Sequence, residues 1–299
     1  MLKKSCFLLL MSGVLVTAVA QKKPAAVNAI MGNTGLETGT QEKRTPPKGG
    51  FTEVDAREVF RIKVPEGGAN GAAIAFHPKE KLYYAAQAGN QDFPMVIFNE
   101  AGEIITSEQK TLADTRGLWY NPRSRQLEGN AYKDGGWFYY ELNRDGIPAV
   151  IKVTREGRNQ PDDHSPGILN TADNEVLFLS GMEFICYNTS GQPLNKKFSL
   201  KIQSKNEADY SEITQAFFEE HYNYRSFIYT GTKGAEIGLL NITRKRVELY
   251  DIKTGYMTKV VSLPLDFKPE SFFNFTYANN TYFLFNKETR QWTGFREKE

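Results

Sequence analysis

The chain has 299 residues, with 37 Lys+Arg against 35 Asp+Glu and a formal net charge of +2. Lys3 and Lys4 account for the whole excess, so the remainder carries no net positive charge to attract nucleic acid or anionic lipid. We therefore expect no nucleic-acid partner.

The first 20 residues have the pattern of a secretory signal peptide. Lys3 and Lys4 precede the apolar run CFLLLMSGVLVTAVA, and small residues stand before Gln21. This run is shorter than the roughly 20 apolar residues of a membrane span. We predict removal of residues 1–20 and export to the periplasm or out of the cell, with no membrane span.

Cysteine usage agrees with a fold that depends on its own core. Cys6 lies in the signal segment, which leaves Cys186 as the one cysteine of the exported chain and no intramolecular disulfide. Cys186 occupies an alternating position in EFICYN, so we expect a buried structural thiol.

Residues 21–52 are predicted to be a disordered linker. They are rich in Pro, Gly, Thr and Lys and show no sustained hydrophobic period. From residue 53 to residue 299 the chain has the patterning of one folded domain.

This domain consists of five repeats of about 45 residues. Each begins with a short apolar strand, a polar turn and a second apolar strand; SFIYTGTKGAEIGLLN (226–241) and SFFNFTYANNTYFLFN (271–286) match without a gap. A third strand, a turn with Asn or Asp and Gly, and a fourth strand follow. The residues before the first strands are spaced by 46, 50, 59 and 45: Asn70, Arg116, Pro166, Arg225 and Glu270.

Four short strands per repeat predict an all-β, five-bladed β-propeller. The fifth repeat lacks a fourth strand, whereas REVFRIKVP (57–65) has the pattern of one ahead of the first repeat. We expect this N-terminal strand to close the last blade, since an unpaired blade would leave an exposed edge. Six blades are the alternative, if residues 203–224 contain further strands.

The repeats resemble those of the broad β-propeller class, including the YVTN and NHL-like propellers of exported bacterial proteins. The resemblance covers residues 53–299 and lies in period and strand plan. The signatures of WD40 and kelch repeats are absent, so the resemblance implies a fold and no particular activity.

The long spacing of 59 is explained by a short amphipathic helix on the rim. Tyr210, Ile213, Phe217, His221 and Tyr224 recur at steps of three and four, with Asp209 placed as N-cap. Adjacent Glu219, Glu220 and His221 would point in different directions on this helix, so we expect no metal site there.

The candidate site lies where the segments entering the first strands converge. Mixed carboxylates and guanidinium groups from different blades suit a polar or anionic ligand. The predicted ligand-binding residues are Asn70, Arg116, His164, Arg225 and Glu270. Asp114, Asp162 and Asp163 lie in the same entry segments.

We expect a binding module for a polar small molecule, a glycan or a protein partner, monomeric and without cofactor or metal. The enzyme alternative is a glycosidase-like hydrolase that uses Asp114, Asp163 and Glu270, since glycoside hydrolysis needs two nearby carboxyl groups. A lactonase-like metal site would recruit Glu270, Asn70 and Asp163. The third alternative is a structural scaffold in an envelope assembly.

The aromatic run between residues 119 and 140 has two interpretations. Read as a list, Trp119, Tyr120, Trp137, Phe138, Tyr139 and Tyr140 suggest a carbohydrate-stacking platform. Because they occupy alternating strand positions within a repeat, we favour packing between blades.

Overall fold

The computed structural model describes residues 50–68, 70–203 and 213–299. The signal peptide and nearly all of the predicted linker lie outside these ranges, as do Tyr210 and Asp209. No helix in the described ranges has the length and apolar character of a membrane span.

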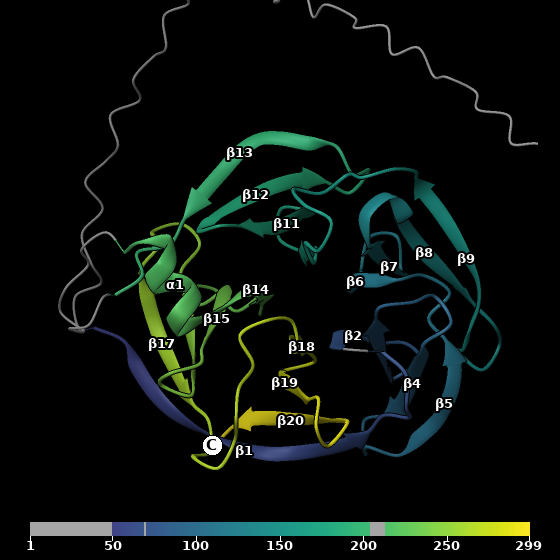
Figure 1. Ribbon diagram of the computed structural model, residues 1–299, viewed down its shortest axis with the longest axis horizontal. Helices are drawn as coiled ribbons and strands as arrows, with labels where there is room; N and C mark the ends of the chain where they lie inside the picture. The colour runs from purple at the N-terminus through teal and green to yellow at the C-terminus, as the bar shows by residue number, and fades with distance from the viewer. Residues whose placement is uncertain (1–49, 69, 204–212) are drawn as a thin grey trace, which may run out of the picture. The chain divides into compact units, whose positions relative to one another are not determined.

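The described residues form an all-β fold of several sheets (Figure 1). The first sheet contains β2 (Asn70–His77), β3 (Leu82–Ala88), β4 (Pro94–Asn99) and β5 (Ile104–Lys110). The second contains β6 (Thr115–Asn121), β7 (Gln126–Ala131), β8 (Trp137–Leu142) and β9 (Pro148–Arg155), with the 3₁₀ turn Lys133–Gly135. The third contains β10 (Ile168–Asn170), β11 (Glu175–Ser180), β12 (Glu183–Asn188) and β13 (Pro193–Ser199).

The remaining strands form one sheet of eight, in the order β14-β15-β16-β17-β1-β20-β19-β18. Its bounds are β14 (Tyr222–Tyr229), β15 (Ile237–Asn241), β16 (Arg246–Tyr250), β17 (Met257–Ser262), β1 (Thr52–Lys63), β20 (Gln291–Glu297), β19 (Thr281–Asn286) and β18 (Phe275–Ala278). β1 pairs antiparallel with β20 over Ala56–Lys63, and its first four residues pair in parallel with β17.

The sheets follow one another around a central axis (Figure 1). The first strands β2, β6, β10, β14 and β18 lie next to this axis, and each contacts the next in a closed cycle. Apolar side chains that alternate along the strands pack between neighbouring sheets. The core is therefore a set of layers between sheets rather than one central cluster.

One turn type recurs because its asparagine side chain accepts hydrogen bonds from the backbone of its own turn. In the last turn of the first three sheets, Asn99, Asn143 and Asn188 each accept two amide hydrogen bonds through Oδ1, and a glycine with positive φ follows three residues later. These turns are local properties of the sequence.

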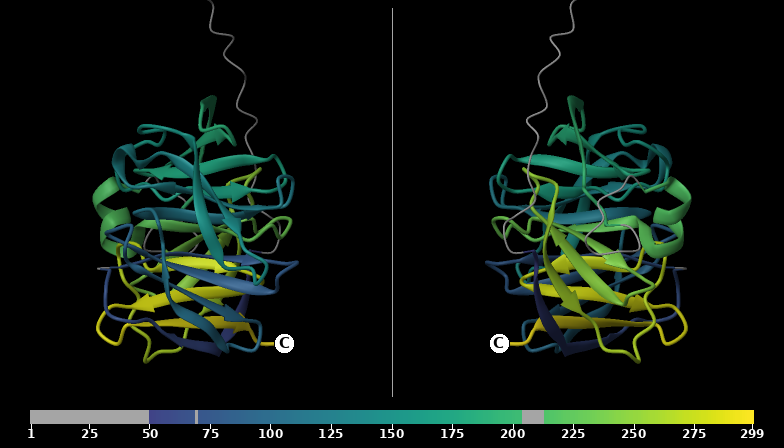
Figure 2. Two further views of the ribbon diagram at one scale, coloured as in Figure 1. Left: turned by 90° about the vertical axis from the view of Figure 1, so that its right-hand side faces the viewer. Right: turned by 90° about the vertical axis from the view of Figure 1, so that its left-hand side faces the viewer.

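The long spacing does contain a helix, α1 (Gln215–His221), but its predicted N-cap was wrong. Thr214 caps it by accepting a hydrogen bond from the Phe217 amide, and Tyr224 already belongs to β14. The buried side chain is Phe218, one position beyond the predicted apolar face. Seen from the side, α1 lies at one face of the domain and the C-terminus at the other (Figure 2).

The ungapped match between residues 226–241 and 271–286 holds for the second strands only. β15 and β19 both end on the aligned asparagine, Asn241 or Asn286. The first strand of the last repeat begins at Phe275, not directly after Glu270, because Asn279 and Asn280 form a tight turn with positive φ where the fourth repeat has a longer loop.

The aromatic run of the second repeat lies mainly in the core. Trp119, Trp137, Phe138 and Tyr140 are buried, as packing between sheets requires. Trp292 is also buried, against the backbone of Gly71. Burial raises the pKa of the Cys186 thiol to about 11, so this buried free cysteine stays protonated at neutral pH, as expected for a structural thiol.

Gly117 allows the second and third sheets to approach closely at the axis. A Cβ at this position would lie 2.2 Å from the Gly167 carbonyl oxygen and 2.6 Å from Asn130 Oδ1. Gly117→Ala is therefore expected to lower the free energy of unfolding by about 3 kcal/mol, since backbone must move. Gly157→Ala, at positive φ but in open space, should cost about 1 kcal/mol. Denaturant unfolding of both variants tests this, and equal losses would contradict it.

Candidate functional site

A group of cationic and aromatic side chains occupies the end of the axis where the first strands begin. We call it the arginine–aromatic cluster. Its members lie in or directly after strands of the second sheet, in the segments that precede β10 and β18, and in β14, and are Arg116, Tyr132, His164, Tyr224, Arg225, Phe272 and Phe273. α1 leads directly into β14, so it lies at this same face.

Arg116 lies at the start of β6 with only 5% of its surface exposed. Its Nη1 and Nη2 donate to Asp114 at 2.5 and 3.3 Å, and its guanidinium carbon lies 4.5 Å from the Tyr132 ring centre and 5.7 Å from that of Phe273. Asp114 also accepts the Gly89 amide, which links the entry segment to the first sheet. Two aromatic faces and a paired carboxylate thus hold the guanidinium in place.

Arg225 is the more accessible of the two arginines. Its Nη1 donates to Asp162 Oδ2 at 2.5 Å, and its guanidinium carbon lies 5.7 Å from the Phe272 ring centre and 5.8 Å from that of Tyr224. The pair joins an entry segment of the third repeat to β14.

The charge state of Asp162 follows from its partners. Burial by itself raises the pKa of this carboxyl, but the His164 amide and Arg225 together lower it below its usual value. The pair therefore stabilises the fold above the ordinary aspartate range, and this contribution disappears in acid as Asp162 becomes protonated.

The His164 ring contacts aromatic rings that lie beside each of the two arginines. Its ring centre is 4.9 Å from that of Tyr132 and 6.2 Å from those of Phe272 and Phe273. His164 Nδ1, Arg116 Nε and Arg225 Nε are all buried without a hydrogen-bond partner within the described protein. The cluster therefore contains at least two buried N–H donors without an acceptor from the described residues.

The other predicted site residues have separate partners. Asn70 Oδ1 accepts from Asn274, Asp163 pairs with Arg158 at 3.3 Å, and Glu270 pairs with Lys287 at 3.0 Å. The structure thus brings Arg116, His164 and Arg225 into one set of ring contacts, whereas the side chains of Asn70 and Glu270 contact Asn274 and Lys287, which are not members of the cluster.

The three carboxylates proposed for the hydrolase alternative do not share a cation in the structure. Each carboxylate proposed for catalysis contacts a different cation: Asp114 contacts Arg116, Asp163 contacts Arg158, and Glu270 contacts Lys287. Within the described ranges, no group of three or more His, Cys, Asp or Glu is placed to hold a metal ion.

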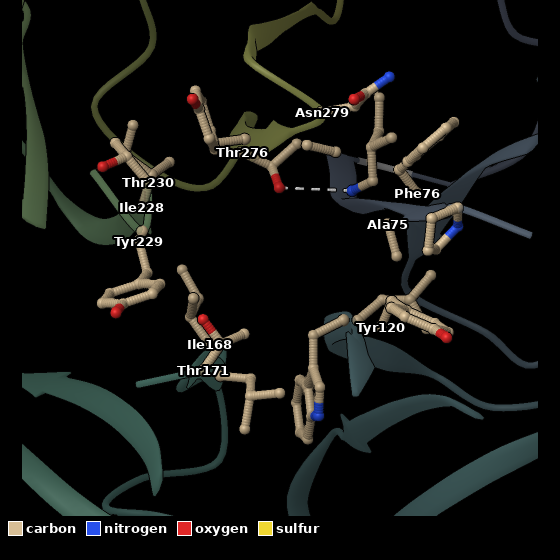
Figure 3. Close-up of a pocket in the computed structure, with 18 residues that line it drawn as sticks. Ala75, Phe76, Tyr120, Ile168, Thr171, Ile228, Tyr229, Thr230, Thr276 and Asn279 are labelled. Carbon is tan, nitrogen blue, oxygen red and sulfur yellow. Dashed lines mark hydrogen bonds between the residues drawn. The ribbon is translucent and has the colours of Figure 1, made fainter. Parts of the chain in front are cut away.

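A cavity that the sequence did not predict lies further along the axis (Figure 3). It has a volume of about 340 Å³ and is lined by all five first strands, for example by Ala75, Tyr120, Ile168, Ile228 and Thr276. These residues are typical of buried strands, so their types give no sign of a cavity. To predict it, one would have needed to know which residues of each first strand face the axis at the same height.

Comparison with solved structures finds propeller-like chains of low sequence identity. Glutaminyl cyclase from Myxococcus xanthus is 12% identical, with a TM-score of 0.49, over 83% of this chain and 98% of that chain. Virginiamycin B lyase from Staphylococcus aureus is 11% identical, with a TM-score of 0.36, over 80% and 73%. A protein of unknown function from Bacteroides thetaiotaomicron is 9% identical, with a TM-score of 0.44, over 78% and 60%.

The sequence matches no protein-family model and no curated protein. Sheets arranged in sequence order around one axis, with their first strands innermost, make this an all-β fold of the broad β-propeller class, without a narrower family signature.

Proposed function

We propose that this protein is an exported, monomeric, five-bladed propeller that binds a small ligand at the arginine–aromatic cluster. The blade count rests on dividing the eight-stranded sheet into β14–β17 and a last blade of β18, β19, β20 and β1. The antiparallel pairing of β1 with β20 supports this division. The part of residues 203–224 that the structure describes holds α1 and the start of β14.

The ligand presents a carboxylate or a similar planar acceptor group. One observation carries this proposal: Arg116 Nε, Arg225 Nε and His164 Nδ1 are buried without partners in a single aromatic cluster. Arginine suits carboxylate recognition because its N–H groups lie in one plane. Each guanidinium already has an aspartate partner, so the site selects by hydrogen-bond geometry more than by net charge.

Arg225→Gln is the variant that tests the site, because Arg225 is partly exposed and its loss leaves the buried Arg116 pair intact. Isothermal titration against acetate, succinate, citrate, free amino acids and glucuronate should identify a carboxylate that binds the wild type. The variant should bind it at least about tenfold more weakly, as expected for a lost charge-assisted hydrogen bond.

Arg61→Gln is the matched control. Arg61 lies on β1, is largely exposed and pairs with Glu58, so its loss should leave affinity unchanged. Equal binding by wild type and Arg225→Gln, or no binding of any carboxylate, would overturn the proposal. Turnover of a glycoside panel that is lost in Glu270→Gln would favour the hydrolase, and capture of an envelope protein without small-molecule binding would favour the scaffold.

A further inference from the structure

We infer that the cavity on the axis is a second binding site, for an uncharged, polyhydroxylated ligand of about the size of a mono- or disaccharide. This inference does not depend on the proposed function of the arginine–aromatic cluster. It concerns a different stretch of the first strands, with different chemistry.

The cavity walls offer hydrogen-bonding groups of the backbone. Each first strand is the terminal strand of its sheet, so one of its edges has no ladder partner. Within the cavity one such group is already satisfied, since Thr276 Oγ1 accepts from the Ile74 amide at 3.4 Å (Figure 3). A ligand with several hydroxyl groups can both donate to and accept from such edges.

The side chains add apolar surface and neutral hydroxyls. Thr171 and Thr230 contribute hydroxyl groups. Phe76, Trp119 and Tyr120 also belong to the lining, while their rings pack on neighbouring aromatic side chains. Apolar surface beside hydroxyls matches a sugar, which has apolar C–H faces and polar edges.

The phenol groups in the wall remain uncharged at neutral pH. Burial raises the pKa of Tyr229 above its usual value and that of Tyr277 to about 12. Both therefore stay protonated, and the Tyr277 hydroxyl donates to Asn280 Oδ1 at 3.2 Å.

Charge and size narrow the ligand class. Among the described residues that line the cavity there is no Asp, Glu, Lys, Arg or His, so a charged group placed there would lose its hydration without a compensating partner from these residues. The volume of about 340 Å³ lies near the lower end for small-molecule sites, roughly 300–1,000 Å³. An uncharged ligand of one or two sugar rings meets both conditions.

Tryptophan fluorescence and calorimetry provide the test on the full chain. Glucose, galactose, N-acetylglucosamine, maltose and cellobiose at millimolar concentrations are the probes. We expect at least one to release or absorb heat and to change the emission of Trp119, which lines the cavity. Trp119→Phe should abolish the emission change while the heat signal remains.

Thr171→Phe is the blocking variant. Thr171 is exposed at the cavity entrance, so the larger ring should fill the opening without disturbing the core. Affinity for the sugar should fall at least about tenfold. Thr171→Ser keeps the hydroxyl and the small size and should bind like the wild type.

Three outcomes would overturn the inference. They are no binding of any neutral sugar, unchanged binding by Thr171→Phe, or a preference for glucuronate that is lost in Arg225→Gln. The last result would place the ligand at the arginine–aromatic cluster, so failure here and failure of the proposed function are distinguishable.

Discussion

Phe60→Ala is expected to lower the free energy of unfolding by about 3–5 kcal/mol. Phe60 lies on β1 and is 7% exposed. Its ring stacks on Phe283 at 5.9 Å and meets Tyr83 and Phe98 edge-on at 5.6 and 5.9 Å. The substitution would leave a cavity between the last strands of the chain and the first sheet, where the two ends of the domain meet.

Denaturant unfolding measures this loss, with Arg57→Ala as control. Arg57 lies on the same strand but is exposed, so its substitution should change stability by less than about 0.5 kcal/mol. If both variants unfold alike, β1 contributes no core packing, and the proposed closure of the last blade by this strand would be wrong.

Glu248→Ala is the second substitution with a large expected effect. Glu248 is 1% exposed and accepts hydrogen bonds from Tyr222, Tyr250, Asn241 and Arg246 at 2.7–3.0 Å. Removal of a buried carboxylate leaves its donors without their shared acceptor, and the expected cost is about 3–5 kcal/mol. Burial, and next the nearby Glu248 charge, raise the pKa of Tyr222 and Tyr250, so both phenols stay protonated and donate.

Glu128 offers a matched comparison within the same chain. Like Glu248 it lies seven residues after an asparagine that donates to it, and it also accepts from Trp119. Glu128 is only half-buried, so Glu128→Ala should lower the free energy of unfolding by about 1–2 kcal/mol, nearer the value of ordinary hydrogen bonds.

Thermal and denaturant unfolding compare the stability losses of Glu248→Ala and Glu128→Ala. If Glu248→Ala is too unstable to purify, Glu248→Gln keeps the shape and should still lose more than Glu128→Gln. Equal losses in the two glutamine variants would contradict the argument.

The repeat plan was readable because its signals are local. Alternation along each strand needs only period two, and turns such as Asn99–Gly102 satisfy their own backbone groups through the asparagine side chain. The errors occur where local signals compete. SFFNFTY has the composition of a strand, but a two-residue Asn279–Asn280 turn moves the pairing, and Phe272 and Phe273 become part of the arginine–aromatic cluster instead.

Only some of the predicted site residues lie in the arginine–aromatic cluster, for a similar reason. Arg116, His164 and Arg225 were predicted from their place before or at the first strands, and their side chains lie in one cluster because the topology carries these segments to one end of the axis. Asn70 and Glu270 occupy equivalent places in the sequence, yet their side chains contact Asn274 and Lys287. Position along a repeat predicts where the backbone goes, whereas side-chain direction depends on which neighbour is within reach.

Most of the strands, the repeat length and the local turns could be predicted from the sequence, because each depends on residues close together in the chain. The tertiary structure alone established that Arg116 and Arg225 share an aromatic cluster, and that Ala75, Tyr120 and Thr276 line one cavity. Both features need the relative rotation and distance of sheets whose residues are up to about 200 positions apart, and those follow from packing in the layers between sheets.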